Sequence, residues 1–278
     1  TLFFQIPKAP AEEERVFIKS LLENYTLSVT HLNNYLRCPR LFYYNNILRV
    51  PSAKTHHQAY GTAIHESLKD WLLGAAESSP VPTKQFLIEQ FEHHLSREIL
   101  SKQEFRGGLE LGQKTLAAYY DHYSQTQNTN VLVEYNFASH GVTLDGVPIT
   151  GKLDKIEVLD EAAKTVHVVD YKTGNPDSKS AELAPGGEYR RQIAFYQLLC
   201  NNSQKFPYKM VSGEIDFVQP SKKSQQFIKK SFTITEDELN NLKTLILDVY
   251  SDIQNLRFLS PDEFETCGEC EYCKPLKQ

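Results

Sequence analysis

Two aspartates and one lysine stand on neighbouring segments that both have the residue alternation of β-strands. Asp154 lies in "GKLDKIEVL", and Asp170 lies in "VVDYK", where Lys172 follows it by two residues. Because side chains alternate along a strand, Asp170 and Lys172 share one face and stand roughly 6.5–7 Å apart. If the two segments pair as a hairpin, Asp154 can converge with Asp170.

The chemistry that this arrangement indicates is metal-assisted hydrolysis of a phosphodiester. Two carboxylates on a half-buried face repel each other and are stable there when a divalent cation lies between them. A neighbouring lysine could orient an attacking water or stabilise negative charge that develops on a phosphate. The spacing alone is equally compatible with a structural arrangement, in which Asp154 and Lys172 form a buried ion pair and Asp170 caps a turn.

Three cysteines near the end of the chain form the pattern C-x-x-C-x-x-C, which is too tight for a framework of disulfides. They are Cys267, Cys270 and Cys273, and Cys38 is the candidate for a fourth ligand. Four thiolates suit either Zn²⁺ or a [4Fe–4S] cluster. Cys200 is expected to be an ordinary buried thiol.

The elements that would position these residues change in type near residue 131. Before it, the apolar spacing predicts a helix over 62–73 that ends at Gly74. It also predicts a helix that follows an N-cap at Thr83 and another over 109–123. After it, the predicted strands and helices alternate, with strands in 131–137, 147–159, 165–172, 211–218 and 226–234 and helices in 187–200 and 239–256. The pattern predicts an α/β core sheet with an α-helical N-terminal elaboration.

We expect one catalytic domain rather than two. Residues 1–26 are interpreted as a lead-in, and residues 27–278 as a single domain with a mostly helical part at 27–127, an α/β catalytic core at 128–256 and a cysteine-rich tail at 257–278. The only methionine is Met210. The expectation is therefore that the chain is a piece of a longer protein or a processed product.

The composition is that of an ordinary globular protein, with 40% hydrophobic residues among 278. No apolar run approaches the roughly 20 residues of a membrane span, and no secretory signal is visible. An intracellular, cytoplasmic location is expected. The net charge of -5 argues mildly against a nucleic-acid partner, although a basic groove can lie on an acidic protein. Pairs of basic residues that could contact DNA are Arg37 with Arg40 and Arg190 with Arg191.

Six motifs, in this order, resemble the RecB-like branch of the PD-(D/E)XK nuclease superfamily. They span Leu27 to Cys273 and read "SVTHLNNYLRCPRLFYY", "GTAIHESL", "GKLD", "DYKTG", "QIAFY" and "CGECEYC". One departure is Leu153, which stands before Asp154 where other branches have proline. The resemblance implies a restriction-endonuclease-like fold, with a mixed central sheet flanked by helices.

The resemblance also implies a role for each matching residue. His65, Asp154 and Asp170 would bind Mg²⁺ or Mn²⁺, together with the backbone carbonyl of Tyr171. Lys172 would be the catalytic lysine. The other two matching residues, Gln192 and Tyr196, would face the site and position DNA or the attacking water. Glu134, on the preceding strand, is a further acidic candidate near the metal.

For the cysteines, the resemblance favours an AddB-like iron–sulfur staple, in which Cys38 joins the three C-terminal cysteines. The last gap is shorter here than the usual spacing, which leaves Zn²⁺ open. Either metal would close a loop of over two hundred residues.

The function that the resemblance implies is a metal-dependent DNA nuclease. We expect the C-terminal nuclease domain of a UvrD/Rep-type helicase–nuclease, which acts in DNA repair on single-stranded DNA from its helicase partner and is associated with the nucleoid. One alternative is a stand-alone exonuclease of prokaryotic adaptive immunity. Another is a nuclease-like DNA-binding module without catalysis.

Overall fold

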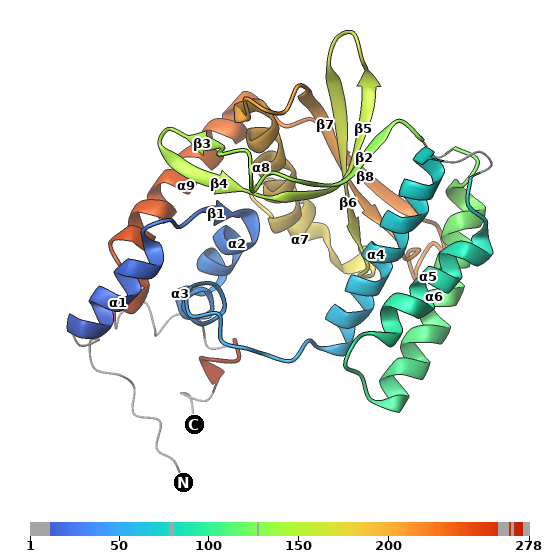
Figure 1. Cartoon of the computed structure of the whole chain (residues 1–278), viewed down its shortest axis with the longest axis horizontal. Coiled ribbons are helices and arrows are strands. Elements are labelled where there is room, and N and C mark those ends of the chain that lie inside the picture. Colours follow the sequence, from blue (N-terminus) through green and yellow to red (C-terminus); the bar gives the residue numbers. More distant parts are fainter. Residues whose placement is uncertain (1–11, 78–80, 127, 261–266, 268–269, 275–278) are drawn as a thin grey trace.

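The computed structural model describes residues 12–77, 81–126, 128–260, 267 and 270–274. Its central feature is a five-stranded mixed sheet with helices on both faces, beside a smaller three-stranded sheet (Figure 1). This is the mixed α/β architecture expected of a restriction-endonuclease-like fold. The predicted lead-in and tail lie partly outside the described residues, at 1–11, 261–266, 268–269 and 275–278.

The central sheet has the strand order β2-β5-β6-β7-β8. Its strands β5 and β6 form the predicted hairpin, and β6 pairs in parallel with β7. The remaining neighbours are antiparallel, so the sheet is mixed. The strand bounds are β2 Val131–Asn136, β5 Lys152–Asp160, β6 Thr165–Lys172, β7 Lys209–Phe217 and β8 Ile228–Phe232.

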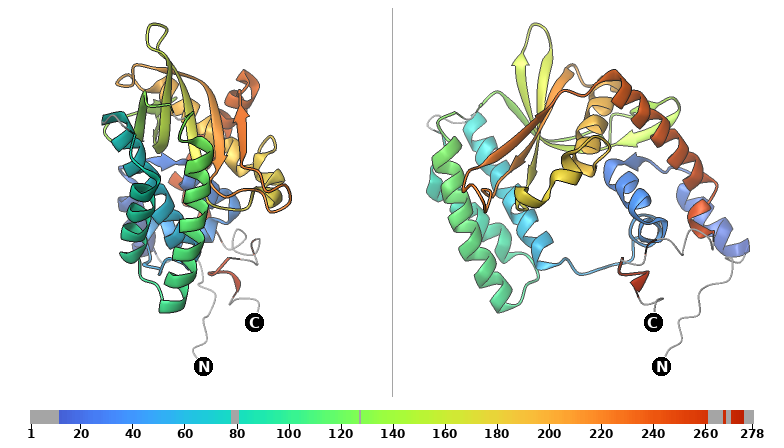
Figure 2. Two further views of the ribbon diagram at one scale, coloured as in Figure 1. Left: turned by 90° about the vertical axis from the view of Figure 1, so that its right-hand side faces the viewer. Right: turned by 180° about the vertical axis from the view of Figure 1, so that it is seen from behind.

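Different helices cover the two faces of this sheet (Figures 1 and 2). On one face, α4 (His56–Glu77), α5 (Lys84–Ser96) and α6 (Lys102–Tyr123) bury a core with Val169 and Tyr171 of β6. On the other face, α8 (Glu188–Asn202) and α9 (Glu236–Gln254) bury a core with Val166 and Val168. Strand β6 therefore alternates its side chains between two hydrophobic cores.

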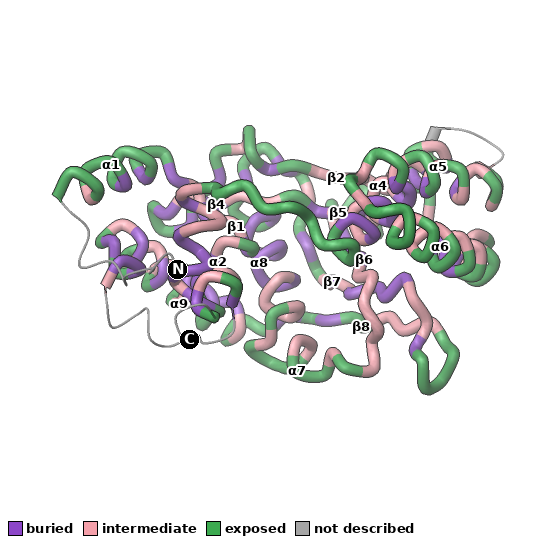
Figure 3. Tube along the Cα trace, turned by 90° about the horizontal axis from the view of Figure 1, so that it is seen from below, coloured by how far each residue is buried: buried purple, intermediate pink, exposed green. Residues whose placement is uncertain are grey.

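The remaining elements build the N-terminal region and the connections. The small sheet has the order β1-β4-β3, with β1 parallel to β4. Figure 3 shows that buried residues follow the strands and α8, whereas α1 is largely exposed. The bounds are α1 Glu12–Leu22, β1 Leu27–Ser28, α2 Val29–Arg37, α3 Pro39–Phe42, a π-helix at Tyr43–Ile47, β3 Thr143–Leu144, β4 Val147–Thr150, α7 Ser180–Leu183, and 3₁₀ turns at Pro176–Ser178 and Arg257–Leu259.

Several predicted helix and strand bounds were wrong. Helix α4 continues through Gly74 to Glu77. Helix α1 lies within residues 1–26, and the interpretation of these residues as a lead-in stays a prediction. Helix α6 begins seven residues before the predicted position 109, at Lys102. The run 147–159, predicted as one β segment, is split into β4 of the small sheet and β5 of the central sheet.

None of the described helices combines the length and the apolar character that crossing a membrane requires.

Candidate active site

The β5–β6 hairpin brings the two predicted aspartates to the same end of the central sheet. Lys155 pairs with Val169, and continuing this antiparallel register by one residue places Asp154 opposite Asp170. The carboxylate of Asp154 accepts a hydrogen bond from the backbone N–H of Tyr171 at 2.9 Å. The convergence predicted from the period of two is therefore confirmed.

Lys172 forms its ion pair with Asp170 rather than with Asp154. Its Nζ lies 2.6 Å from Oδ2 of Asp170, which is 2% exposed and lies within strand β6. The structural alternative of a buried Asp154–Lys172 pair with Asp170 in a turn is therefore wrong. The lysine and the buried carboxylate form one polar unit on the α8 face of the sheet.

Helix α8 supplies the groups that hold this unit in place. Gln192 accepts from Nζ of Lys172 at 2.8 Å and donates to Oδ1 of Asp170 at 2.7 Å. The hydroxyl of Tyr196 donates to the same Oδ1 at 3.0 Å. Because Gln192 and Tyr196 are four residues apart, one helical face presents both to β6.

The start of α8 is fixed by Gly187, because any side chain at this position would displace the backbone of α7. A Cβ on Gly187 would lie 2.2 Å from the carbonyl oxygen of Ala181 and 2.5 Å from that of Glu182. This close approach between α7 and the N-cap of α8 sets where α8 begins. The position of Gln192 in the second turn of α8 follows from it.

The electrostatics of the two aspartates differ although they lie side by side. Burial raises the pKa of Asp170, and the Lys172 ammonium opposes that rise only in part. Burial would also raise the pKa of Asp154, but hydrogen bonding and charge attraction from His65 lower it overall. Lys172 keeps a raised pKa because Asp170 outweighs its burial. Asp154 is therefore the carboxylate more readily ionised.

Three side chains at this end of the sheet could hold a metal ion together. One ligand atom each of His65, Glu134 and Asp154 lies within 4.8 Å of the others. A single imidazole with carboxylate oxygens suits a hard divalent cation such as Mg²⁺ or Mn²⁺. Among the described residues, Asp170 does not join this group. The ligand roles of Asp170 and of the Tyr171 carbonyl stay predictions.

Glu134 reaches this group through an unusual backbone conformation. Its φ is 54°, in the left-handed region, although it lies within strand β2. Its carboxylate forms an ion pair with Lys152 of the adjacent strand. The sequence indicated Glu134 only as an acidic residue on a nearby strand. No residue pattern predicts the left-handed backbone conformation that places its carboxylate beside His65 and Asp154.

An open cavity lies over these donors. It has a volume of about 640 Å³ and is lined by His65, Glu134 and Asp154 together with residues of α4 and β5. Thr173 forms its border at the end of β6. A phosphate group can therefore approach the donors from solvent.

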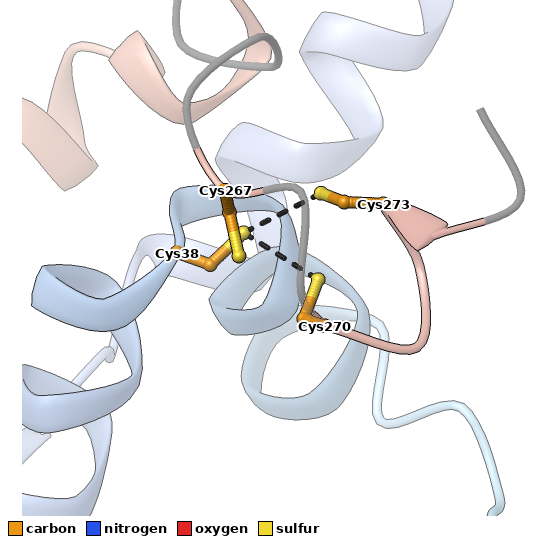
Figure 4. A group of neighbouring side chains, drawn as sticks. All are labelled: Cys38, Cys267, Cys270 and Cys273. Atoms are coloured by element: carbon orange, nitrogen blue, oxygen red, sulfur yellow. Dashed lines mark hydrogen bonds between the residues drawn. The ribbon is translucent and has the colours of Figure 1, made fainter. Parts of the chain in front are cut away.

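The four predicted cysteines form a second cluster, away from this sheet (Figure 4). Their Sγ atoms all lie within 4.8 Å of one another, and Sγ of Cys38 is 3.7 Å from those of Cys270 and Cys273. Burial raises the pKa of Cys38, which keeps its thiol protonated. A bound cation would stabilise the four deprotonated thiolates at this place. The donor set fits Zn²⁺ or an iron–sulfur cluster. Cys200 lies apart from them, buried in α8 as expected.

Most of the arginines predicted to contact DNA bond to other residues of the chain or are buried within it. Arg190 forms a two-pronged ion pair with Glu238, and Arg191 donates to Asn33 Oδ1 and Gly186 O. Arg40 is 3% exposed, whereas Arg37 lies exposed at the end of α2. DNA contact stays a prediction for all four, and for Arg40 it would require the side chain to become exposed.

Comparisons with known proteins agree with this geometry. The family model of the PD-(D/E)XK nuclease superfamily matches residues 26–274. A crystal structure from Eubacterium rectale, described as a provisionally assigned exonuclease, is similar at a TM-score of 0.53 and 14% identity, over 97% of this chain and 94% of that one. The crystal structure of SSO0001 has a TM-score of 0.38 and 16% identity, over 94% of this chain and 97% of that one. The first likeness supports the fold alone. No curated protein matches the chain.

Proposed function

Because the chain belongs to the PD-(D/E)XK nuclease superfamily, we propose that it is a metal-dependent deoxyribonuclease that hydrolyses phosphodiester bonds. The observation that carries this proposal is the contact of Lys172 with Asp170 at 2.6 Å, beside the donor group of His65, Glu134 and Asp154. A protein that had lost catalysis would have no reason to keep a half-buried lysine and two aspartates together. This argues against the non-catalytic DNA-binding module.

In this proposal each residue has a defined task. The Lys172 ammonium stabilises negative charge that develops on the phosphate, and Gln192 keeps that ammonium aimed. Asp170 balances the charge of Lys172, while Tyr196 holds Asp170 in one orientation. His65 and Asp154, with Glu134, form the cation site, and a bound Mg²⁺ or Mn²⁺ supplies a polarised phosphate and a more acidic water.

The finer features of the proposal rest on the order of the sequence motifs. These features are the RecB-like branch, single-stranded DNA as substrate, a helicase in the same polypeptide or complex, a role in DNA repair, and an intracellular location near the nucleoid. The four-cysteine cluster supports the iron–sulfur assignment, with Zn²⁺ as the alternative. A stand-alone exonuclease of prokaryotic adaptive immunity is the second candidate, since the same motif order is compatible with it.

The test is a cleavage assay on end-labelled single-stranded and double-stranded DNA, with Mg²⁺, with Mn²⁺ and with EDTA. We expect cleavage with either cation and none with EDTA. Lys172→Ala should abolish cleavage. Because it leaves the buried Asp170 without its cation, the melting temperature should also fall, and circular dichroism at the assay temperature checks that the variant is folded. Lys223→Ala, which changes an exposed lysine outside the site, should cleave like the wild type. Full activity of Lys172→Ala would disprove the proposed role.

A further inference from the structure

A second, larger cavity adjoins the opening over the metal donors. Its volume is about 1040 Å³, and it lies between the start of α4, the start of α6 and the loops that follow β6 and β7. His57 and Thr173 line both this cavity and the opening at the donors. A chain molecule that lies over the donors and continues past Thr173 therefore enters the larger cavity.

The cavity is lined by planar rings and amides, together with three leucines and the carboxylate of Glu104, which lies 3.8 Å from Nδ1 of His56. The rings of His56 and His57 have centroids 3.9 Å apart, and Tyr60 lies one turn further along α4. Gln103 and Gln219 add amide groups that can both donate and accept hydrogen bonds. Flat rings and amides are the groups that stack on nucleobases and bind their edges.

The loop after β7 brings a positive charge to the rim of the cavity. Lys222 lines the cavity, and the loop is held by Asp177, which accepts from Ser221 Oγ at 2.6 Å and from Lys223 N at 3.1 Å. Because Asp177 follows β6 by five residues, these hydrogen bonds connect the loop of Lys222 to the end of β6, which carries Asp170 and Lys172. Lys222 is thus positioned to meet a backbone phosphate.

Gly107 is the position from which a side chain could be built into the cavity. It lies inside helix α6 and lines the cavity. A Cβ at Gly107 would meet no atom within 4 Å, so a larger side chain there enters the cavity without displacing the core. At Gly112 of the same helix, by contrast, a Cβ would lie 2.1 Å from the ring of Phe91. Gly107 is therefore the suitable position at which to block the cavity.

We propose that this cavity receives one or more unpaired nucleotides of the strand that is cut, next to the phosphodiester at the metal donors. The inference rests on the proposed nuclease function and deepens it. The volume of about 1040 Å³ lies just above the roughly 300–1,000 Å³ of small-molecule sites, which is room for a nucleotide. A duplex keeps its bases paired and stacked, so it could fill the cavity only by flipping a base out. The cavity therefore favours a single strand.

The test uses Gly107→Leu, which enters the cavity without adding a ring that could stack on a base, and Gly107→Ala, which adds only one methyl group. Binding is measured in EDTA, without cleavage, with single-stranded oligonucleotides that carry the fluorescent base 2-aminopurine at one position. We expect the fluorescence to be quenched at one or two positions with the wild type and with Gly107→Ala. Gly107→Leu should lose this quenching and bind roughly 5- to 150-fold more weakly, which is the range for the loss of a stacked base.

A second measurement needs no variant. Oligonucleotides with a single abasic position are scanned for binding to the wild type, and the same one or two positions should weaken binding. Lys222→Ala should lower the salt dependence of binding, while Lys223→Ala should not. Equal binding of all abasic oligonucleotides, or an unchanged quench in a folded Gly107→Leu, overturns the inference. Failure to cleave with Mg²⁺ or Mn²⁺ would instead overturn the proposed function, since these measurements do not depend on cleavage.

Discussion

The side-chain nitrogen of Gln192 donates a hydrogen bond to Oδ1 of Asp170 over 2.7 Å. The oxygen of the same amide accepts from Lys172, so one neutral group contacts both members of the ion pair. The amide supplies one donor and one acceptor in fixed positions, which a carboxylate or an alkyl side chain cannot do. Gln192 thereby sets the distance and direction of the lysine relative to Asp170.

Gln192→Glu should therefore lower the cleavage rate by roughly 10–100-fold, the usual range for a group that orients an active-site residue. The new carboxylate still accepts from Lys172 but faces the carboxylate of Asp170, which raises the pKa of Asp170 further. The measurement is the single-turnover cleavage rate, with the melting temperature as a check on folding. Asn201→Asp adds the same charge to the exposed part of α8 and should leave the rate unchanged.

Glu134→Gln should weaken cation binding by roughly tenfold or more, because it replaces a charged ligand oxygen by a neutral one. Mn²⁺ affinity can be measured by calorimetry or by electron paramagnetic resonance, without any substrate. Glu66→Gln is the matched control, since Glu66 lines the same opening but its carboxylate pairs with Lys69. Equal Mn²⁺ affinity of the two variants would show that Glu134 is not a ligand.

The sequence predicted the parts of the site that follow from a regular repeat. The period of two placed Asp170 and Lys172 on one face, and the spacing of four placed Gln192 and Tyr196 on one helical turn. Both depend only on local geometry. Glu134 was a candidate only because it is an acidic residue on the preceding strand, and its left-handed φ of 54° inside that strand could not be predicted.

The wrong helix bounds have an equally local cause. Gly74 was predicted to stop α4, but a Cβ there would lie 2.6 Å from Pro82, so the glycine serves a close contact and the helix continues. The start of α6 was predicted too late because Gly107 and Gly108 lower its helix propensity. The capping box of Ser101 and Glu104 nevertheless begins the helix, and packing against α5 sustains it.

Cys267→Ser should remove one ligand of the cysteine cluster and destabilise the whole protein. The cluster joins α3 to the C-terminal residues, and a crosslink over a loop this long contributes on the order of 4–5 kcal/mol. For a chain of this size we expect a fall in melting temperature of roughly 10 °C. An unchanged melting temperature would contradict the staple.

The colour of the protein tests which metal the cluster holds. With a [4Fe–4S] cluster, the wild type should be brown and absorb in the visible range, and Cys267→Ser should lose this absorption. Cys200→Ser should keep it, because Cys200 lies in α8, apart from the cluster. A colourless wild type with one zinc per chain would replace the iron–sulfur assignment by Zn²⁺.

The stability of the protein should fall between pH 6.5 and pH 4 because of His31. Burial, together with the charge of Arg49, lowers the pKa of His31 from 6.5 to about 4. In that window the unfolded state binds more protons than the folded state, so stability is fully present above pH 6.5 and is lost as the pH falls toward 4. The shift corresponds to roughly 3 kcal/mol at the acidic end. His31→Gln keeps a polar group near the Tyr25 hydroxyl, which now contacts Nδ1 of His31 at 3.0 Å, but it cannot be protonated. Urea unfolding at several pH values should therefore show a shallower loss of stability in the variant, and parallel curves for the two proteins would refute this role of His31.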